Sequence, residues 1–206
     1  MEMVYVVERS DLFESFYPQG FTSLSNVLDE LDTMACLHEG FFVQRSVAEH
    51  RPDWKQIIPY AVLRQGDKVW LMTRSKEGGE DRLHDMKYIG VGGHTNPYDE
   101  DYGNVPCWDR AMEREFNEEA EVWLEGVRLI DPDELHVRVL GFINDDSNAV
   151  GAVHFGLVYE LQIPEGAVVV TEDKGAWVHI DDVDGLDEGE VENWTKLIIS
   201  SICEEH

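Results

Sequence analysis

Five glutamates lie between residues 108 and 124, a segment with the spacing of a helix, and three of them are unusual in their position. At about 100° per residue, Glu115 and Glu119 fall within an arc of otherwise apolar side chains, and Glu118 lies at its edge. Carboxylates four residues apart stack on one side of a helix and repel each other by roughly 0.2–0.5 kcal/mol. Because partly buried like charges need a compensating cation, this spacing favours a hard divalent metal ion held by oxygen ligands.

The segment before this helix favours a binding site over the alternative of a solvated acidic helix. Residues 88–100 read as a short apolar strand, a Gly92-Gly93 turn and a polar loop. Glycines at such a turn let main-chain NH and CO groups approach a ligand closely. Strand, glycine turn, loop and acidic helix together indicate a site for a metal ion and phosphate.

This arrangement resembles the Nudix hydrolases, the MutT-like proteins. Their motif ends in Arg-Glu-U-x-Glu-Glu-x-Gly-U, where U is aliphatic or bulky. Residues 114–119, Arg-Glu-Phe-Asn-Glu-Glu, match it position by position, and Gly92-Gly93-His94 is similar to its opening glycine turn. There are two departures: the loop before the helix is about seven residues longer than usual, and Glu121 replaces the usual glycine. The acidic residue of the first half is Asp99 or Glu100.

The resemblance implies a fold and an activity. The implied fold is an α/β/α sandwich with a mixed β-sheet over residues 56–206, with residues 1–55 as an N-terminal elaboration packed on it. The implied activity is hydrolysis of a diphosphate linkage in a nucleotide or a similar small molecule. Mg²⁺ or Mn²⁺ would be the cofactor, because such an ion bridges phosphate oxygens and can activate a water.

The resemblance also implies roles for particular residues. Glu115, Glu118 and Glu119 would bind the metal, directly or through water. The turn at 92–94 would contact the cofactor and phosphate, and Arg114 would orient a glutamate of the motif, unless it only pairs with a glutamate one helical turn later.

The general base stays open. Glu119 and Glu115 are candidates. Glu172 is a third, because it follows the apolar run 168–170, although a solvated charge at a strand end is the competing interpretation.

Other residues have a structural interpretation that competes with a functional one. Trp70 and Trp177 could stack on a base, but tryptophans in strands are more often part of the core. His154 could be a ligand, but a histidine within a strand is more often a hydrogen-bonded core residue. Asp145 and Asp146 suit a polar turn. Four basic residues before the glycine turn could neutralise a phosphate or lie on the surface of a loop; they are Arg74, Lys76, Arg82 and Lys87.

Composition narrows the class of protein. The 206 residues are 43% hydrophobic and carry a formal net charge of −27. This charge argues against nucleic acid polymers and anionic membranes as partners, since both attract Lys and Arg. Three cysteines without a CxxC pattern are expected to be free thiols, and no signal sequence or membrane span is apparent. We therefore expect a cytoplasmic protein with a small-molecule diphosphate substrate, and a homodimer is compatible with the resemblance.

Periodicity predicts the remaining elements. Helices are expected at 24–35, capped by Thr22-Ser23, at 108–123, stopping near Gly126, and at 190–202. Strands are expected at 3–7, 41–43, 57–63, 69–73, 88–91, 127–130, 136–143, 150–161 and 177–180. The run 168–170 is expected to pair with 150–161.

Two other functions compete with hydrolysis. Isopentenyl-diphosphate isomerases share the implied fold but need a cysteine in the strand region before the motif and a histidine cluster. Cys107 lies instead just before the helix, and no such cluster precedes it. A non-catalytic Nudix-like domain that binds a nucleotide metabolite as a sensor is the other alternative, but it would have no need to keep the glutamates.

Overall fold

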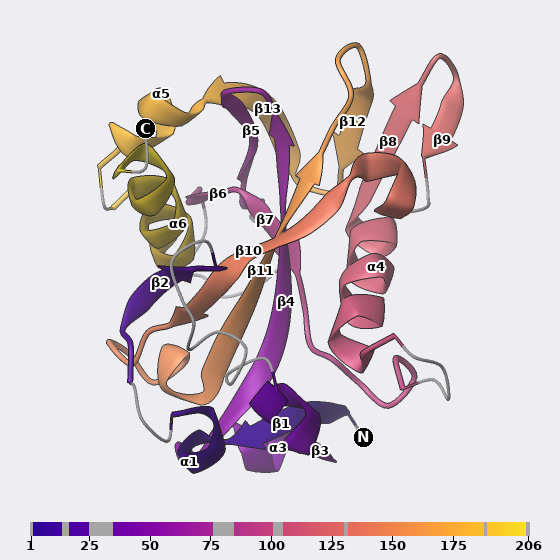
Figure 1. The fold of residues 1–206 in the computed structure, drawn as a ribbon. Coiled ribbons are helices and arrows are strands. Elements are labelled where there is room, and N and C mark those ends of the chain that lie inside the picture. Colours follow the sequence, from indigo (N-terminus) through magenta and orange to yellow (C-terminus); the bar gives the residue numbers. More distant parts are fainter. Residues whose placement is uncertain are drawn as a thin grey trace. The chain divides into compact units, whose positions relative to one another are not determined.

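The computed structural model describes residues 2–13, 17–24, 35–75, 85–100, 105–129, 132–187 and 189–204 (Figure 1). The chain forms two compact units. The first comprises Met1–Tyr60, Gly92–Arg114 and Val139–Val158, and the second comprises Ala61–Val91, Glu115–Arg138 and Tyr159–His206. The expected elaboration over residues 1–55 stays a prediction.

The first unit is built around antiparallel strands. Strand β1 (Met3–Glu8) pairs with β3 (Phe41–Gln44) and with the beginning of β4 (Trp54–Gln65), while β2 (Gly20–Ser23) pairs with β10 (Val137–Asn144). Val4 and Val6 of β1 are fully buried against Ala48, because alternate side chains of a strand point to the same face. Short helical turns complete the unit: α1 (Arg9–Leu12), η2 (Leu37–Glu39), α3 (Arg45–Ala48) and η5 (Gly151–Val153).

The second unit contains two sets of strands. In one, β5 (Lys68–Thr73) pairs with the end of β4, with β6 (Lys87–Tyr88) and with β13 (Lys174–His179). In the other, β8 (Ala120–Leu124) lies between β9 (Val127–Leu129) and β12 (Val168–Thr171). Three helical elements complete the unit: η4 (Pro132–Leu135), α5 (Ile180–Asp184) and α6 (Asn193–Glu204).

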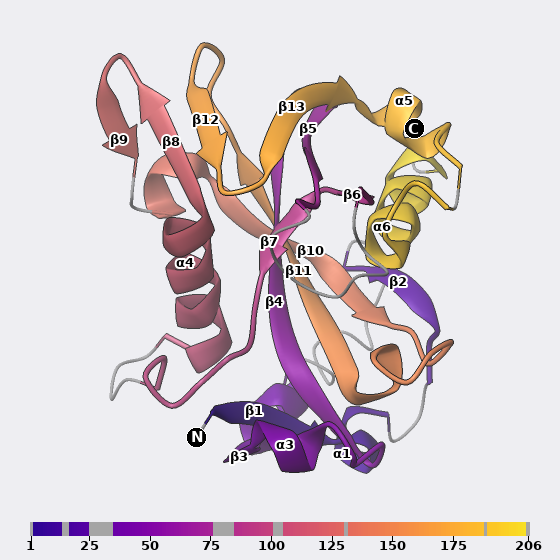
Figure 2. The same cartoon turned by 180° about the vertical axis from the view of Figure 1, so that it is seen from behind.

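Several elements contribute residues to both units: β4, β7 (Gly90–Gly92), β10, β11 (His154–Gln162) and α4 (Cys107–Glu119). Nearly all residues of β4 and β11 are buried, as expected of strands covered on both faces. In the second unit, α6 and the end of α4 lie on opposite sides of β4 and β5 in both views (Figures 1 and 2). The predicted α/β fold with helices on both sides of a sheet is thus confirmed.

The prediction that the central helix continues to about residue 123 is wrong. Helix α4 ends at Glu119, and Ala120–Leu124 form β8. Strand β8 is hydrogen-bonded on both edges, to β12 and β9, and these ladders outweigh the helix propensity of an isolated glutamate. Glu125 and Gly126, at φ 50° and 81°, form the two-residue turn into β9, so Gly126 ends a hairpin strand rather than a helix.

Two further expectations need correction. The run 168–170 pairs with β8 rather than with 150–161, where residues 151–153 form a 3₁₀ turn before β11 begins at His154. Thr22 and Ser23 lie in β2 instead of capping a helix, because their backbone pairs with β10. The body of the helix expected at 24–35 lies outside the described residues.

Candidate active site

Helix α4 carries the acidic motif with the predicted burial. Its inner side holds Trp108, Ala111, Met112 and Phe116, each at most 4% exposed. Glu115 and Glu119 are half-buried beside these residues, whereas Glu118 is exposed. Arg114 and Asn117 on the opposite arc are half-buried as well, so burial alone does not separate the two arcs. Two carboxylates of like charge, Glu115 and Glu119, lie one turn apart in a partly desolvated position.

Contacts from two later segments meet the end of α4. The guanidinium of Arg128 in β9 donates to the main-chain oxygen of Asn117 at 3.1 Å. The main-chain nitrogen of Glu172, just after β12, donates to the main-chain oxygen of Glu119 at 3.2 Å. The last carbonyl groups of a helix have no partner within the helix, so these contacts stabilise its end. The second contact places the backbone of Glu172 next to the end of the motif, while its role as a base stays a prediction.

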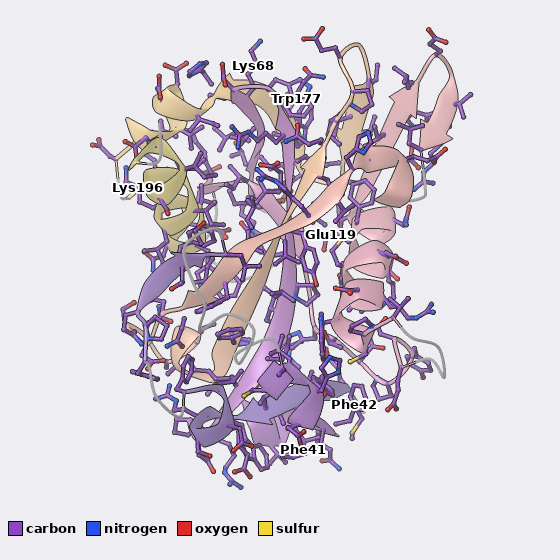
Figure 3. The ribbon with its side chains drawn as sticks, viewed as in Figure 1. Phe41, Phe42, Lys68, Glu119, Trp177 and Lys196 are labelled. Carbon is purple, nitrogen blue, oxygen red and sulfur yellow. The ribbon has the colours of Figure 1, made fainter. Side chains whose placement is uncertain are left out.

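Glu119 has a strongly perturbed carboxyl group. Its pKa is raised from 4.5 to about 7, first by burial and then by the negative charge of Glu115. Glu172 and Asp173 act in the same direction, while Arg74 opposes them. A carboxyl group surrounded by carboxylates holds its charge at neutral pH only when a cation compensates. Figure 3 marks Glu119 at the carboxyl end of α4.

Arg74 and Asp173 belong to a polar network next to Glu119. The guanidinium of Arg74 lies 3.9 Å from the ring centre of Tyr88 and donates to Glu192 at 2.8 Å. The Tyr88 hydroxyl donates to Asp173 at 2.8 Å. Burial and the bond to Asp173 raise the pKa of Tyr88, so the phenol keeps its proton. The network fixes Arg74 near the carboxylates, which agrees with the hypothesis that it helps to neutralise a phosphate.

The carboxylate oxygens near Glu119 are ligands of the kind that hard divalent cations prefer. Within the described parts of the chain, no three His, Cys, Asp or Glu side chains are already gathered around one point as metal ligands. The groups near Glu119 are nevertheless carboxylates, the oxygen donors that Mg²⁺ and Mn²⁺ prefer. Burial and the neighbouring carboxylates raise the pKa of Glu119, and a bound cation would lower it. Glu115, Glu118, Glu119 and Glu172 are the residues that could hold the ion.

The first unit contains the glycine turn and Arg114. The guanidinium of Arg114 donates to both carboxylate oxygens of Asp99, at 2.8 and 3.0 Å, and to the main-chain oxygen of His94 at 3.0 Å. Asp99 is 4% exposed, and its carboxylate also accepts from the nitrogen of Asn96 at 2.8 Å. Asp99, rather than the exposed Glu100, is thus the acidic partner of the motif arginine.

The glycine turn is closely packed. A Cβ atom at Gly92 would lie 2.4 Å from the main-chain oxygen of Pro59, so only glycine fits there. His94 is half-buried, and its Nε2 lies 3.0 Å from Oε1 of Gln56 and 3.4 Å from Nε2 of His154. Burial lowers the pKa of His94 to about 3, so its ring is neutral at pH 7. Gly93 is half-buried and lies between Gly92 and His94.

The competing structural interpretations hold for several other candidates. Trp70 and Trp177 pack edge to face at 5.2 Å, and Trp70 donates to Thr171 at 3.0 Å. Asp145 accepts from the nitrogen of Ser147 at 3.0 Å, as a turn residue does. Lys87 pairs with Glu190 at 3.2 Å, and Lys76 and Arg82 lie outside the described residues.

Sequence reasoning missed two charged residues. Asp173 follows Glu172 directly, so the acidic pair was a visible signal. Lys55 is fully buried and donates to Asp146 at 2.7 Å and to the main-chain oxygen of Gly151 at 2.9 Å. Asp146 is therefore more than a turn residue, because it also pairs with Arg9 at 2.8 Å. The three free cysteines agree with the prediction.

Comparisons with known proteins identify relatives of this chain and of its fold. The chain is 33% identical to Protein YmaB of Bacillus subtilis (strain 168) over 206 residues, 96% of each protein. It matches the crystal structure of Tm1382, described as a candidate Nudix hydrolase, with a TM-score of 0.73 and 26% identity over 100% of both chains. DR0079 from Deinococcus radiodurans is more distant, with a TM-score of 0.48 and 20% identity over 70% of this chain and 81% of that one. No family model matches the sequence.

The chain belongs to the Nudix hydrolase family. The resemblance based on residues 114–119 is thereby confirmed. Among the described residues, no helix has the length and apolar character needed to cross a membrane. The expected homodimer stays a prediction.

Proposed function

We propose that this protein is a metal-dependent pyrophosphohydrolase. Its substrate would be a nucleotide or another small molecule with a diphosphate linkage, and its cofactor Mg²⁺ or Mn²⁺. The observation that carries the proposal is the environment of Glu119, a half-buried carboxylate surrounded by Glu115, Glu172 and Asp173. Such a concentration of negative charge costs stability unless a cation offsets it.

The residues of the chain have distinct tasks in this proposal. Glu115, Glu118 and Glu119 would hold the ion from one side of α4, and the ion would supply charge neutralisation and activate a water. Glu172 is the candidate base, since a main-chain hydrogen bond to Glu119 holds it beside the motif. Arg74 would compensate charge on the substrate phosphate, held in place by Tyr88 and Glu192.

Arg114 would act through position rather than through contact with the substrate. Its bidentate pair with Asp99 ties the loop that follows the glycine turn to α4. A fork-shaped guanidinium fixes both distance and orientation of its partner. Gly92, Gly93 and His94 would thus present main-chain groups from a fixed turn.

The isomerase alternative is disfavoured by the state of its candidate cysteine. Burial raises the pKa of Cys107 to about 11, so the group is a protonated thiol at neutral pH rather than a reactive thiolate. The three free thiols suit a reducing compartment, which supports the cytoplasm as the proposed location.

The experiment is a release assay for phosphate and nucleoside monophosphate over a panel of nucleoside-diphosphate-linked compounds with Mg²⁺ and with Mn²⁺. Glu119→Gln should abolish release, whereas Glu165→Gln, an exposed carboxylate in the same unit, should retain it. Equal turnover by both variants would contradict the proposed site. Binding of a nucleotide without turnover in the wild type would instead identify a sensor domain.

A further inference from the structure

Two imidazole rings of the first unit face each other with their Nε2 atoms. His94 follows the glycine turn and His154 begins β11, and their Nε2 atoms are 3.4 Å apart. The rings are tilted by 60°, with centres 5.5 Å apart. Both side chains are half-buried.

The spacing of these atoms matches that of two ligands on one metal ion. Zinc binds imidazole nitrogen at about 2.0–2.1 Å, so two nitrogens on one ion lie about 2.9 Å apart at right angles and about 3.4 Å apart in a tetrahedron. The distance from His94 Nε2 to His154 Nε2 is 3.4 Å, and that from His94 Nε2 to Gln56 Oε1 is 3.0 Å. Both distances lie within this range.

The remaining hydrogen bonds orient His154 as a ligand. Its Nδ1 lies 2.7 Å from the main-chain oxygen of Val150, which can only accept, so Nδ1 carries the proton and Nε2 of the neutral ring holds a lone pair. Metal-binding histidines commonly donate their second nitrogen to a backbone carbonyl in this way. His94 needs only to carry its proton on Nδ1 instead of Nε2, a change of tautomer with no net proton released.

Gln56 is the third polar side chain at this place, and it is 1% exposed. Its amide nitrogen has no hydrogen-bond partner among the described residues. This nitrogen is a donor, so a water molecule that completes the coordination of a metal ion could accept from it. The amide oxygen of Gln56 already lies beside His94 and is available as a third donor.

The surrounding charges do not exclude a cation. Arg45 and Lys55 are the nearby positive groups that act on His154, and Glu49 opposes them. Arg45 is itself paired with Glu2 at 3.0 Å and with Glu49 at 2.9 Å. Lys55 is paired with Asp146 at 2.7 Å. Arg45 acts on His94 as well and opposes a cation there, and the carboxylates paired with Arg45 and Lys55 weaken this effect.

We propose that His94 and His154, with the amide oxygen of Gln56, form a second metal site for a late first-row divalent ion such as Zn²⁺. Imidazole nitrogen favours Zn²⁺, Co²⁺ and Ni²⁺ over Mg²⁺, so this site differs in chemistry from the carboxylates of α4. With three neutral protein donors, a water completes the coordination, as in open zinc sites.

The test measures binding rather than turnover, so its failure is distinguishable from failure of the proposed hydrolase activity. Co²⁺ is titrated into untagged protein in excess Mg²⁺, which occupies the oxygen sites, and its visible absorption is followed. We expect one Co²⁺ to bind per chain in a saturable manner and to show the intense absorption of a four-coordinate site. Addition of Zn²⁺ should displace this Co²⁺. His154→Asn keeps a donor toward Val150 but removes Nε2, and it should weaken binding at least ~10-fold, as should His94→Gln.

The matched control is His136→Asn. His136 is exposed and lies at φ 46°, a conformation that asparagine tolerates, so this variant should bind Co²⁺ like the wild type. Equal binding by the wild type and His154→Asn would overturn the proposal and leave the rings as a hydrogen-bonded pair. Should the variants fail to fold, ¹⁵N shifts of the imidazole rings in wild-type protein decide: Zn²⁺ must shift Nε2 of two of the eight histidines and no others.

Discussion

The main-chain nitrogen of Glu172 donates a hydrogen bond of 3.2 Å to the main-chain oxygen of Glu119. This bond joins the last residue of α4 to the residue after β12, two positions far apart in the sequence. The two side chains, in contrast, repel each other, and the charge of Glu172 raises the pKa of Glu119. A backbone contact that holds two like charges near each other is the arrangement expected where a cation is to be bound.

Removal of divalent ions should abolish hydrolysis. The carboxylates around Glu119 can stabilise a diphosphate only through a bridging cation, since without one they repel it. The measurement is turnover after dialysis against EDTA, followed by addition of excess Mg²⁺ or Mn²⁺, which should restore the rate. Full turnover in EDTA would contradict the metal-dependent mechanism.

Glu119→Gln should lower turnover by at least ~100-fold, because a group that stabilises charge in the transition state is lost. The fold should remain intact, since glutamine has nearly the same shape. The measurement is kcat on the best substrate together with a thermal melt, with Glu165→Gln as the control. A near-normal kcat would show that Glu119 is not part of the reacting site.

The stability of the metal-free protein should fall as Glu119 ionises. Its pKa is raised from 4.5 to about 7 in the folded state, so folding favours the protonated form. The contribution of this group is therefore fully present below pH 4.5 and is lost as the pH rises through 7. In EDTA, the melting temperature of Glu119→Gln should rise relative to that of the wild type between pH 5 and pH 8.

Saturating Mg²⁺ provides the control for this pH dependence. A bound cation offsets the repulsion among the carboxylates, so the gain of Glu119→Gln at pH 8 should disappear or reverse. A difference between the two proteins that is the same at pH 5 and pH 8 in EDTA would mean that Glu119 titrates normally.

Arg114→Lys should destabilise the protein by about 1–3 kcal/mol, because a buried carboxylate loses part of its hydrogen bonding. Lysine keeps the charge but cannot donate to both oxygens of Asp99 as the guanidinium does. Chemical denaturation measures the loss. Glu100→Gln, at the exposed neighbouring carboxylate, is the matched control and should change stability little; an equal effect would contradict the assignment of Asp99.

Glu121→Gly should cost roughly 0.5–1 kcal/mol, the penalty of glycine inside a strand. Glu121 pairs with Val170 in the β8–β12 ladder and lies 3.2 Å from Arg128, so both of these partners belong to strands β12 and β9. Restoring the family's usual glycine should therefore not raise kcat. Glu121→Gln separates the loss of charge from the loss of the side chain, and a large gain in rate with glycine would show that Glu121 impairs the site.

The sequence by itself determined the motif and the side of the helix on which its glutamates lie. The positions of Glu115, Glu118 and Glu119 relative to the apolar side of α4 follow from the helical repeat, which depends only on neighbouring residues. The same holds for strands β1 and β5, and for the identification of the family from residues 114–119. Local spacing carries this information, and the structure agrees with it.

Only the tertiary structure decided where α4 ends and what surrounds its carboxylates. Residues 120–124 have no strand signal strong enough to override a helical reading, but β9 and β12 pair with them from both sides. Asp99 rather than Glu100 meets Arg114, and His94 meets His154, because loops and strands distant in sequence bring these side chains together. Such contacts depend on long-range pairing, whose energy no local window of the sequence contains.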